Sequence, residues 1–116
     1  MFNFRAHELT LNRVHDRVKI KEGDEHLELR VDADPMRMVA GLTEAQRRLR
    51  TVTEDMSDEE KTGIAQYFAG VIFGSDQAAK LLDFYHGDAA CVIMICGQYF
   101  TGRLAKLIDK AQRKIK

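Results

Sequence analysis

The only proline of the chain, Pro35, separates two patterns of apolar residues. Before it, apolar residues recur at every second position, as in strands with one buried face. After it, they recur at intervals of three and four, as in amphipathic helices. The alternating residues are Phe2, Phe4, Leu9, Leu11, Val18, Ile20, Leu27, Leu29 and Val31. We therefore predict an α+β fold, with an N-terminal antiparallel β-hairpin or small sheet over about residues 1–32 followed by a helical body.

The turn of the hairpin is predicted at residues 21–25, where a Gly-Asp pair lies between two alternating runs. A two-stranded ribbon is barely stable alone. Its apolar face must therefore pack on the helices that follow. At 116 residues the chain has room for one hydrophobic core. We predict a single domain over residues 1–116, β-rich over 1–33 and α-helical over 34–116.

Four helices are predicted, over about residues 35–55, 58–73, 76–86 and 89–114. Asp34 before Pro35, the Ser57 to Glu60 capping box and Asp88 are typical helix starts. Gly74 and Gly87 are typical helix ends, and Ser75 is expected to cap the third helix.

Each helix has an apolar face that predicts its buried side. The predicted faces are Val39, Leu42, Leu49, Val52 and Met56; then Ile64, Tyr67, Phe68, Val71 and Ile72; then Ala79, Leu82 and Tyr85; and finally Phe100, Leu104, Leu107, Ile108, Ala111 and Ile115. The last helix begins with residues 89–96, which are apolar all round and so predict burial on every side.

Residues 84–100, FYHGDAACVIMICGQYF, place His86, Asp88, Cys91 and Cys96 close together in the sequence. A structural zinc site needs about four converging ligands. Two cysteines five positions apart on a helix point about 140° apart. We therefore predict no metal site and assign both cysteines to the core. His86 is expected in the last turn of the third helix, where its side chain can bond terminal carbonyls.

No other arrangement of side chains suggests catalysis or cofactor binding. The remaining histidines, His7, His15 and His26, have no nucleophile beside them. The carboxylates Asp16, Glu22, Asp24 and Glu25 lack the spacing of a calcium loop and are assigned to a solvated hairpin tip. The glycines form no phosphate-binding loop. We predict no catalytic residue, no cofactor and no enzyme activity.

Charge and hydropathy bear on partners and location. Eighteen basic residues balance eighteen acidic ones, so nucleic acid is not a favoured ligand. Two cysteines fit a reducing cytoplasm, and the first residues lack the apolar region of a signal peptide. The apolar run from Ala89 covers about nine residues, fewer than the 20 or so of a membrane span. The basic end of the last helix is attributed to its favourable interaction with the helix dipole.

Four glycines lie inside predicted helices: Gly63, Gly70, Gly97 and Gly102. Each costs about 1 kcal/mol of helix stability relative to alanine. We expect close helix-helix approach to offset this cost, either within the fold or between copies of the chain.

The helical half resembles the small tail assembly chaperones of long-tailed bacteriophages and prophages. The resemblance covers roughly residues 57–110. It rests on a helix that ends in Val-Ile-Phe-Gly at residues 71–74, a short helix with paired alanines at 78–79 and an aromatic at Phe84, and the turn Gly87-Asp88 before a long helix containing Phe100. Ser75-Asp76 stands where that pattern has a second glycine or an acid.

The resemblance implies a non-enzymatic protein of the host bacterial cytoplasm that binds the tape measure protein during tail assembly and then yields to the tail tube protein. As a hypothesis, the side chains that supply packing or partner contact are Tyr67, Phe68, Val71, Tyr99, Phe100 and Leu104. A homo-oligomer is left open. The alternative function is a small regulatory or nucleic-acid-binding helical protein that uses the basic first and last helices.

Overall fold

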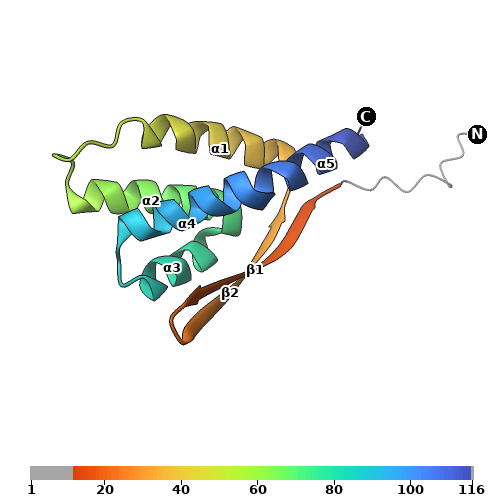
Figure 1. Ribbon diagram of the computed structural model, residues 1–116. Coiled ribbons are helices and arrows are strands. Elements are labelled where there is room, and N and C mark those ends of the chain that lie inside the picture. The colour runs from red at the N-terminus through yellow and green to blue at the C-terminus, as the bar shows by residue number, and fades with distance from the viewer. Residues whose placement is uncertain (1–11, 116) are drawn as a thin grey trace, which may run out of the picture.

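The computed structural model describes the backbone of residues 12–115 and the side chains of residues 12–113 (Figure 1). A two-stranded antiparallel sheet, β1 (Val14–Glu22) and β2 (Glu25–Ala33), precedes the helices α1 (Pro35–Leu49), α2 (Asp58–Phe73), α3 (Ser75–Phe84) and a last long helix. That last helix comprises α4 (Ala89–Tyr99), a π-helical segment (Phe100–Leu104) and α5 (Ala105–Ile115). The predicted α+β class is confirmed. The predicted strands around Phe2 and Leu9 lie outside the described residues.

The hairpin packs one face on the helices. Gly23 has a φ of 62° and Asp24 does not have a positive φ, the pattern of a type II′ turn with glycine at its first central position. The register pairs Val18 with Leu29 and Ile20 with Leu27. Because side chains alternate across a strand, these residues share one face, and Leu29 is only 1% exposed. The helices therefore supply the partner that the ribbon needs.

The side chain of Gln77 on α3 holds the edge of β2. Its amide oxygen accepts from the Arg30 backbone N–H at 2.8 Å, and its amide nitrogen donates to the Arg30 carbonyl at 2.6 Å. The same nitrogen lies 2.6 Å from the Phe73 carbonyl at the end of α2. One side chain thus takes the place of a neighbouring strand at Arg30 and ties the hairpin to two helices.

The first helix differs from the prediction in its length and in its buried face. As predicted, Asp34 caps it, accepting from the Met36 N–H at 3.0 Å. The helix ends at Leu49, not near residue 55, because Thr51 bonds the Arg48 carbonyl through both its N–H and its hydroxyl. The buried residues are Pro35, Met38, Leu42 and Ala45. Val39 and Val52, predicted as buried, are 38% and 37% exposed.

The close contact at Gly41 explains part of the difference between the predicted and the observed buried face of α1. A Cβ at Gly41 would lie 2.7 Å from Cγ1 of Val71, so α1 and α2 meet there through a glycine. The close approach brings the Gly41 side of α1 toward α2 and turns Val39 outward. At Gly63, Gly70, Gly97 and Gly102, an added Cβ would have no neighbour within 4 Å in the part of the chain that the structure describes. The expected close approach within the fold at these four glycines is therefore wrong.

The second and third helices meet at Gly74, whose φ of 88° and ψ of 157° suit only glycine. Ser57 caps α2 as predicted, accepting from the Glu60 N–H at 3.1 Å. Ser75, however, is the first residue of α3 and does not cap it; Gly74 occupies that position. The buried residues of α3 are Ala78 and Leu81, so the predicted face with Ala79 is wrong by one residue, and Ala79 is exposed.

The turn after α3 places His86 in the left-handed region, with a φ of 57°. The His86 N–H donates to the Asp83 carbonyl at 2.9 Å, and the Gly87 N–H donates to the Leu82 carbonyl at 2.8 Å. This pair of bonds is a Schellman motif. His86 therefore ends the helix through its backbone, and the predicted role for its exposed side chain in the last helical turn is wrong.

Asp88 starts the last helix as predicted, accepting from the Cys91 N–H at 3.3 Å. The helix runs to Ile115 without a break, but Phe100–Leu104 is π-helical. At 100° per residue, Leu104 would lie about 80° away from the line of Cys96, and Arg103 would take its place in the core. The π segment adds one residue to the turn. As a result Cys96 and Leu104 are both 0% exposed, while Arg103 reaches the surface.

Candidate protein-binding groove

A shallow apolar groove lies between α1 and the last helix. It has a volume of about 180 Å³. Its lining residues are Val39, Leu42, Thr43 and Gln46 from α1, and Phe100, Ala105 and Ile108 from the last helix. None of these side chains is charged. Phe100 belongs to the π segment, so the same local geometry that buries Leu104 also places an aromatic ring in the groove.

Apolar side chains beside the groove are exposed. Met36, near its end, is 63% exposed, and Val39 in its wall is 38% exposed. The Gln112 amide nitrogen lies 3.9 Å from the sulfur of Met36, so α5 approaches the first turn of α1 at that end. The groove therefore presents apolar surface to solvent along two neighbouring helices, a form that suits the apolar stripe of a third helix.

The six residues predicted to contact partners occupy four different environments. Phe68 and Leu104 belong to the buried core. Tyr67 and Val71 lie half-buried where α2 faces α1. The Arg48 guanidinium lies 3.8 Å from the centre of the Tyr67 ring, a cation–π contact. Of the six, Phe100 alone lines the groove.

Tyr99 belongs to a polar cluster that the sequence did not predict. Its ring stacks on Phe73 with centroids 5.8 Å apart, and its hydroxyl donates to Oδ2 of Asp16 at 2.7 Å. Arg103 donates to both carboxylate oxygens of Asp16, at 2.6 and 2.9 Å. Asp16 is paired with Val31 in the hairpin register. The assignment of Asp16 to a solvated hairpin tip is therefore wrong. The detectable signal was its place in the alternation between Val14 and Val18.

The chemistry of this cluster follows from its burial. The Asp16 side chain is 8% exposed, whereas Arg103 is 59% exposed. The hydrogen bonds from Arg103, together with that from Tyr99, lower the pKa of the Asp16 carboxyl. Burial, reinforced by the bond to Asp16, raises the pKa of the Tyr99 hydroxyl well above its ordinary value. With these two pKa shifts, the carboxyl of Asp16 is ionised and the hydroxyl of Tyr99 is neutral at neutral pH. The hydrogen bonds that Asp16 accepts from Tyr99 and Arg103 join the hairpin to the last helix.

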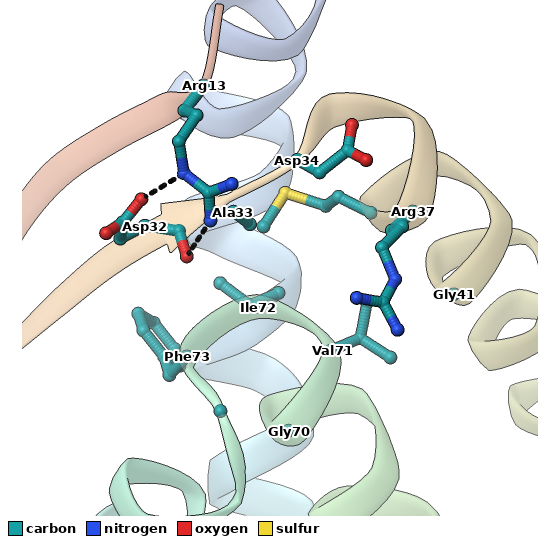
Figure 2. Close-up of a pocket in the computed structure, with 12 residues that line it drawn as sticks. Arg13, Asp32, Ala33, Asp34, Arg37, Gly41, Gly70, Val71, Ile72 and Phe73 are labelled. Atoms are coloured by element: carbon teal, nitrogen blue, oxygen red, sulfur yellow. Dashed lines mark hydrogen bonds and ion pairs between the residues drawn. The ribbon is translucent and has the colours of Figure 1, made fainter. Parts of the chain in front are cut away.

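A second concavity, of about 500 Å³, lies where the end of β2 meets the start of α1 and the end of α2 (Figure 2). Arg13 at its mouth is paired with Asp32 at 2.7 Å. Arg37 extends into it toward Val71, while the Asp34 carboxylate points away (Figure 2). Within residues 12–113, Arg37 makes no ion pair. The concavity holds acidic and basic groups in equal number, so it has no strong preference for a charged ligand.

The cysteines and carboxylates show no metal-binding arrangement within the described residues, where no three His, Cys, Asp or Glu side chains converge. Cys96 is fully buried, and that burial raises the pKa of its thiol to about 12. The hydrogen bond to Asp88 raises the pKa of the half-buried Cys91 thiol. Both shifts disfavour the reactive thiolate. That the protein is not an enzyme stays a prediction.

The apolar part of the last helix is longer than the run of about nine residues that the sequence indicated. By length and composition alone, the helix Ala89–Arg113 can cross a membrane, so shortness does not exclude insertion. A mostly buried core helix of a soluble protein passes the same test, whereas 22% of this apolar window is buried. Here Val92, Cys96 and Leu104 are each 0% exposed, and Arg103 is paired with the hairpin. These contacts build the helix into the fold.

Comparisons with known proteins return no relative. No family model, no curated protein and no solved structure matches this chain.

Proposed function

We propose that this protein is a phage or prophage tail assembly chaperone that binds the tape measure protein in the host bacterial cytoplasm and later yields to the tail tube protein. The observation that carries the proposal is the exposed, uncharged groove between α1 and the last helix, with Phe100 in its floor. A tape measure protein consists largely of long helices, and an apolar groove between two helices suits a helical ligand.

Two further features support a binding role. The polar cluster of Asp16, Tyr99 and Arg103 fixes the π segment on its hairpin side, so Phe100 is held in place before any ligand arrives. A preformed site reduces the entropy lost on binding. In addition, no atom of the described residues comes within 4 Å of a Cβ added at any of the four helix glycines, so contact with a partner is one reason for glycine at these positions.

Co-expression tests the proposal. The tagged chain is produced together with the large coiled-coil protein encoded next to it, and co-purification is measured. We expect the two proteins to co-purify and Val39→Glu to abolish the complex, because a charge would then lie in the groove wall. Met94→Glu is the matched control, since Met94 is exposed on α4 and does not line the groove. Failure of the two wild-type proteins to co-purify would contradict the proposal.

Gene context gives an independent check. A tail tube gene upstream and a very long tape measure gene downstream are the expected neighbours. A neighbourhood without tail genes would remove the basis of the phage assignment, although a binding role for the groove could still be tested.

The alternative function, nucleic-acid binding, draws on the basic residues of α1 and α5. Several of these are already paired: Glu44 accepts from Arg47 at 2.6 Å and from Arg48 at 2.8 Å, and Asp109 pairs with Arg113 at 2.7 Å. The bonds from Arg47 and Arg48 lower the pKa of Glu44 to about 2, so Glu44 stays ionised at neutral pH. Salt separates the two functions, because phosphate binding weakens steeply with added salt.

A further inference from the structure

The two edges of the hairpin differ in how their backbone groups are used. At β2, the Gln77 side chain bonds both the N–H and the carbonyl of Arg30, so these two groups point away from β1. Arg30 is paired with Arg17. In an antiparallel ladder, two opposite residues either exchange both bonds or direct both pairs of groups outward. The N–H and the carbonyl of Arg17 therefore point away from β2, as do those of every second residue of β1.

This outward row consists of His15, Arg17, Lys19 and Lys21, and we call it the β1 edge. The sheet has two strands in the described part of the chain, so no third strand pairs with the edge there. Within residues 12–115, no backbone group from outside the sheet bonds to it. The N–H of Arg17 donates to the adjacent Asp16 carboxylate. A row of free N–H and carbonyl groups on a strand is a template for one more strand.

The side chains of the β1 edge are cationic. Arg17, Lys19 and Lys21 are exposed, and they alternate with the core-facing Val18 and Ile20 along the strand. Within residues 12–113, none of the three cations forms an ion pair. On a third strand, side chains directly opposite them would have Cβ atoms about 5 Å away. Acidic residues at every second position would therefore match the edge in both charge and spacing.

The last helix lies on the core-facing side of β1. Near the start of the strand, the Tyr99 hydroxyl donates to Asp16. Near its end, Glu22 is close enough to Cys91 to affect it: the pKa of the Cys91 thiol is raised by its hydrogen bond to Asp88, by burial, and by the charges of Asp88 and Glu22. One row of α4 side chains therefore follows β1 along its length.

An exposed apolar side chain lies beside that row. Met94 is 62% exposed. At 100° per residue, the buried Val92 lies about 100° from Cys91 around α4, and Met94 lies about 60° from Cys91 in the opposite direction. The buried side of α4 packs on α2, which also packs on β2. Met94 is thus on the flank of α4 beyond β1, where a third strand would place its core-facing side chains.

We propose that the β1 edge binds an extended segment of another protein in which acidic and apolar residues alternate. Main-chain bonds hold the segment, its acids oppose the cations of the edge, and its apolar residues cover Met94. A second copy of this chain fits less well, because two β1 edges would oppose cations with cations. Residues 1–11 contain a single acid, Glu8. The β1 edge is separate from the groove, so this inference goes beyond the proposed function and is tested independently of it.

Synthetic peptides of nine residues, the length of β1, serve as probes. One alternates glutamate with valine, and the other alternates lysine with valine. Binding to the full chain is measured by fluorescence anisotropy. We expect the glutamate peptide to bind about tenfold more tightly at low salt, and the difference to disappear near 1 M salt, where the Debye length is about 3 Å. A glutamate peptide N-methylated at the residues that would bond the edge should not bind, because the main-chain bonds are lost.

Variants locate the binding site. Lys19→Glu should weaken the glutamate peptide about tenfold and strengthen the lysine peptide by a similar factor. Lys80→Glu, at an exposed cation on α3, is its matched control and should change neither affinity. Met94→Gln should weaken both peptides about threefold, whereas Met36→Gln, at an equally exposed methionine on α1, should have no effect. Circular dichroism and thermal melting of each variant check that it is folded.

Hydrogen exchange of the Lys19 and Lys21 amides tests the edge directly. Both should exchange rapidly in the free chain and about tenfold more slowly with saturating glutamate peptide, while the Leu29 amide, inside the ladder, is protected in both states. Slow exchange of Lys19 and Lys21 in the free chain would show that the edge is already paired and would overturn the inference.

Three further outcomes would contradict it. Absence of saturable glutamate-peptide binding would mean that the cations serve to keep the edge unpaired. Equal affinity of the N-methylated peptide would reduce the interaction to charge attraction without strand addition. Tighter binding of duplex DNA than of the glutamate peptide, lost in Lys19→Glu, would assign the cationic row to phosphates.

Discussion

The π segment of the last helix has two sides that differ in kind. On the hairpin side, Asp16, Tyr99 and Arg103 form a closed polar joint in which every charged or polar group has a partner. On the α1 side, Phe100 lies in an open apolar groove. The comparison shows how one local irregularity serves two purposes. The joint uses directional bonds to hold the segment, and the groove keeps apolar surface in reach of solvent.

The largest expected effect is on the joint. Asp16→Asn removes the charge that pairs with Arg103, and we expect the free energy of unfolding at pH 7 to fall by about 2 kcal/mol, the range of a hydrogen bond to a charged group. Chemical denaturation measures it. The control is Asp32→Asn, which removes an ion pair whose carboxylate is 60% exposed and should lower the free energy of unfolding much less, because solvent screens an exposed pair. Equal effects of the two variants would show that the joint contributes no more than a surface pair.

The pH dependence of this difference has a definite sign. The pKa of Asp16 is lowered in the folded protein from an ordinary value of 3.8, so the carboxylate stabilises the fold above that pH. As the pH falls through the lowered pKa, the stabilisation is lost. The difference between wild type and Asp16→Asn should stay constant from pH 7 to about 5 and shrink below 3.8. A difference that grows on acidification would contradict the assignment.

The same comparison of a closed contact with an open surface can be made at two glycines, Gly41 on α1 and Gly63 on α2. Gly41→Ala should lower the free energy of unfolding by about 1 to 2 kcal/mol, because its Cβ would lie 2.7 Å from Val71. Gly63→Ala should raise it by about 1 kcal/mol, because alanine favours helix and its Cβ would meet no atom of the described residues within 4 Å. If Gly63 serves a partner, the more stable variant should also bind less tape measure protein. Stabilisation by both substitutions would show that the α1–α2 contact is looser than it appears.

A smaller effect is expected from the phenol of the joint. Tyr99→Phe removes the hydroxyl that donates to Asp16 and keeps the ring on Phe73, so a loss of about 1 kcal/mol is expected in chemical denaturation. Tyr67→Phe is the control: its hydroxyl bonds to no residue in the described part of the chain, so its loss should stay below about 0.5 kcal/mol. A null result for Tyr99 would leave Arg103 as the sole anchor of Asp16.

The smallest effect on stability is expected in the groove. Val39→Gln changes a side chain that is 38% exposed, and the free energy of unfolding should change by less than about 0.5 kcal/mol. The thermal midpoint should therefore remain close to that of the wild type, even though partner binding is lost. A large loss of stability would mean that Val39 belongs to the core, and the groove would then not be a free surface.

The sequence by itself determined the features that depend on neighbours in the chain. Asp34 with Pro35, Ser57 with Glu60, and Asp88 each cap a helix because a short polar side chain bonds amides two or three residues away. The alternation around Gly23 determined the hairpin and its buried face for the same reason, since side-chain direction follows local geometry.

The tertiary structure decided what depends on contacts between distant segments. The pairing of Asp16 with Arg103 joins residues that are 87 positions apart, and the π segment forms because Leu104 must face the same core as Cys96. The candidate groove was found only in part: Phe100 was predicted as a partner contact, whereas Val39 and Ile108 were assigned to the buried faces of their helices. An apolar stripe indicates which side of a helix is buried, but the amount of that side covered by its neighbours is set by how closely the helices approach, as Gly41 and Val71 show.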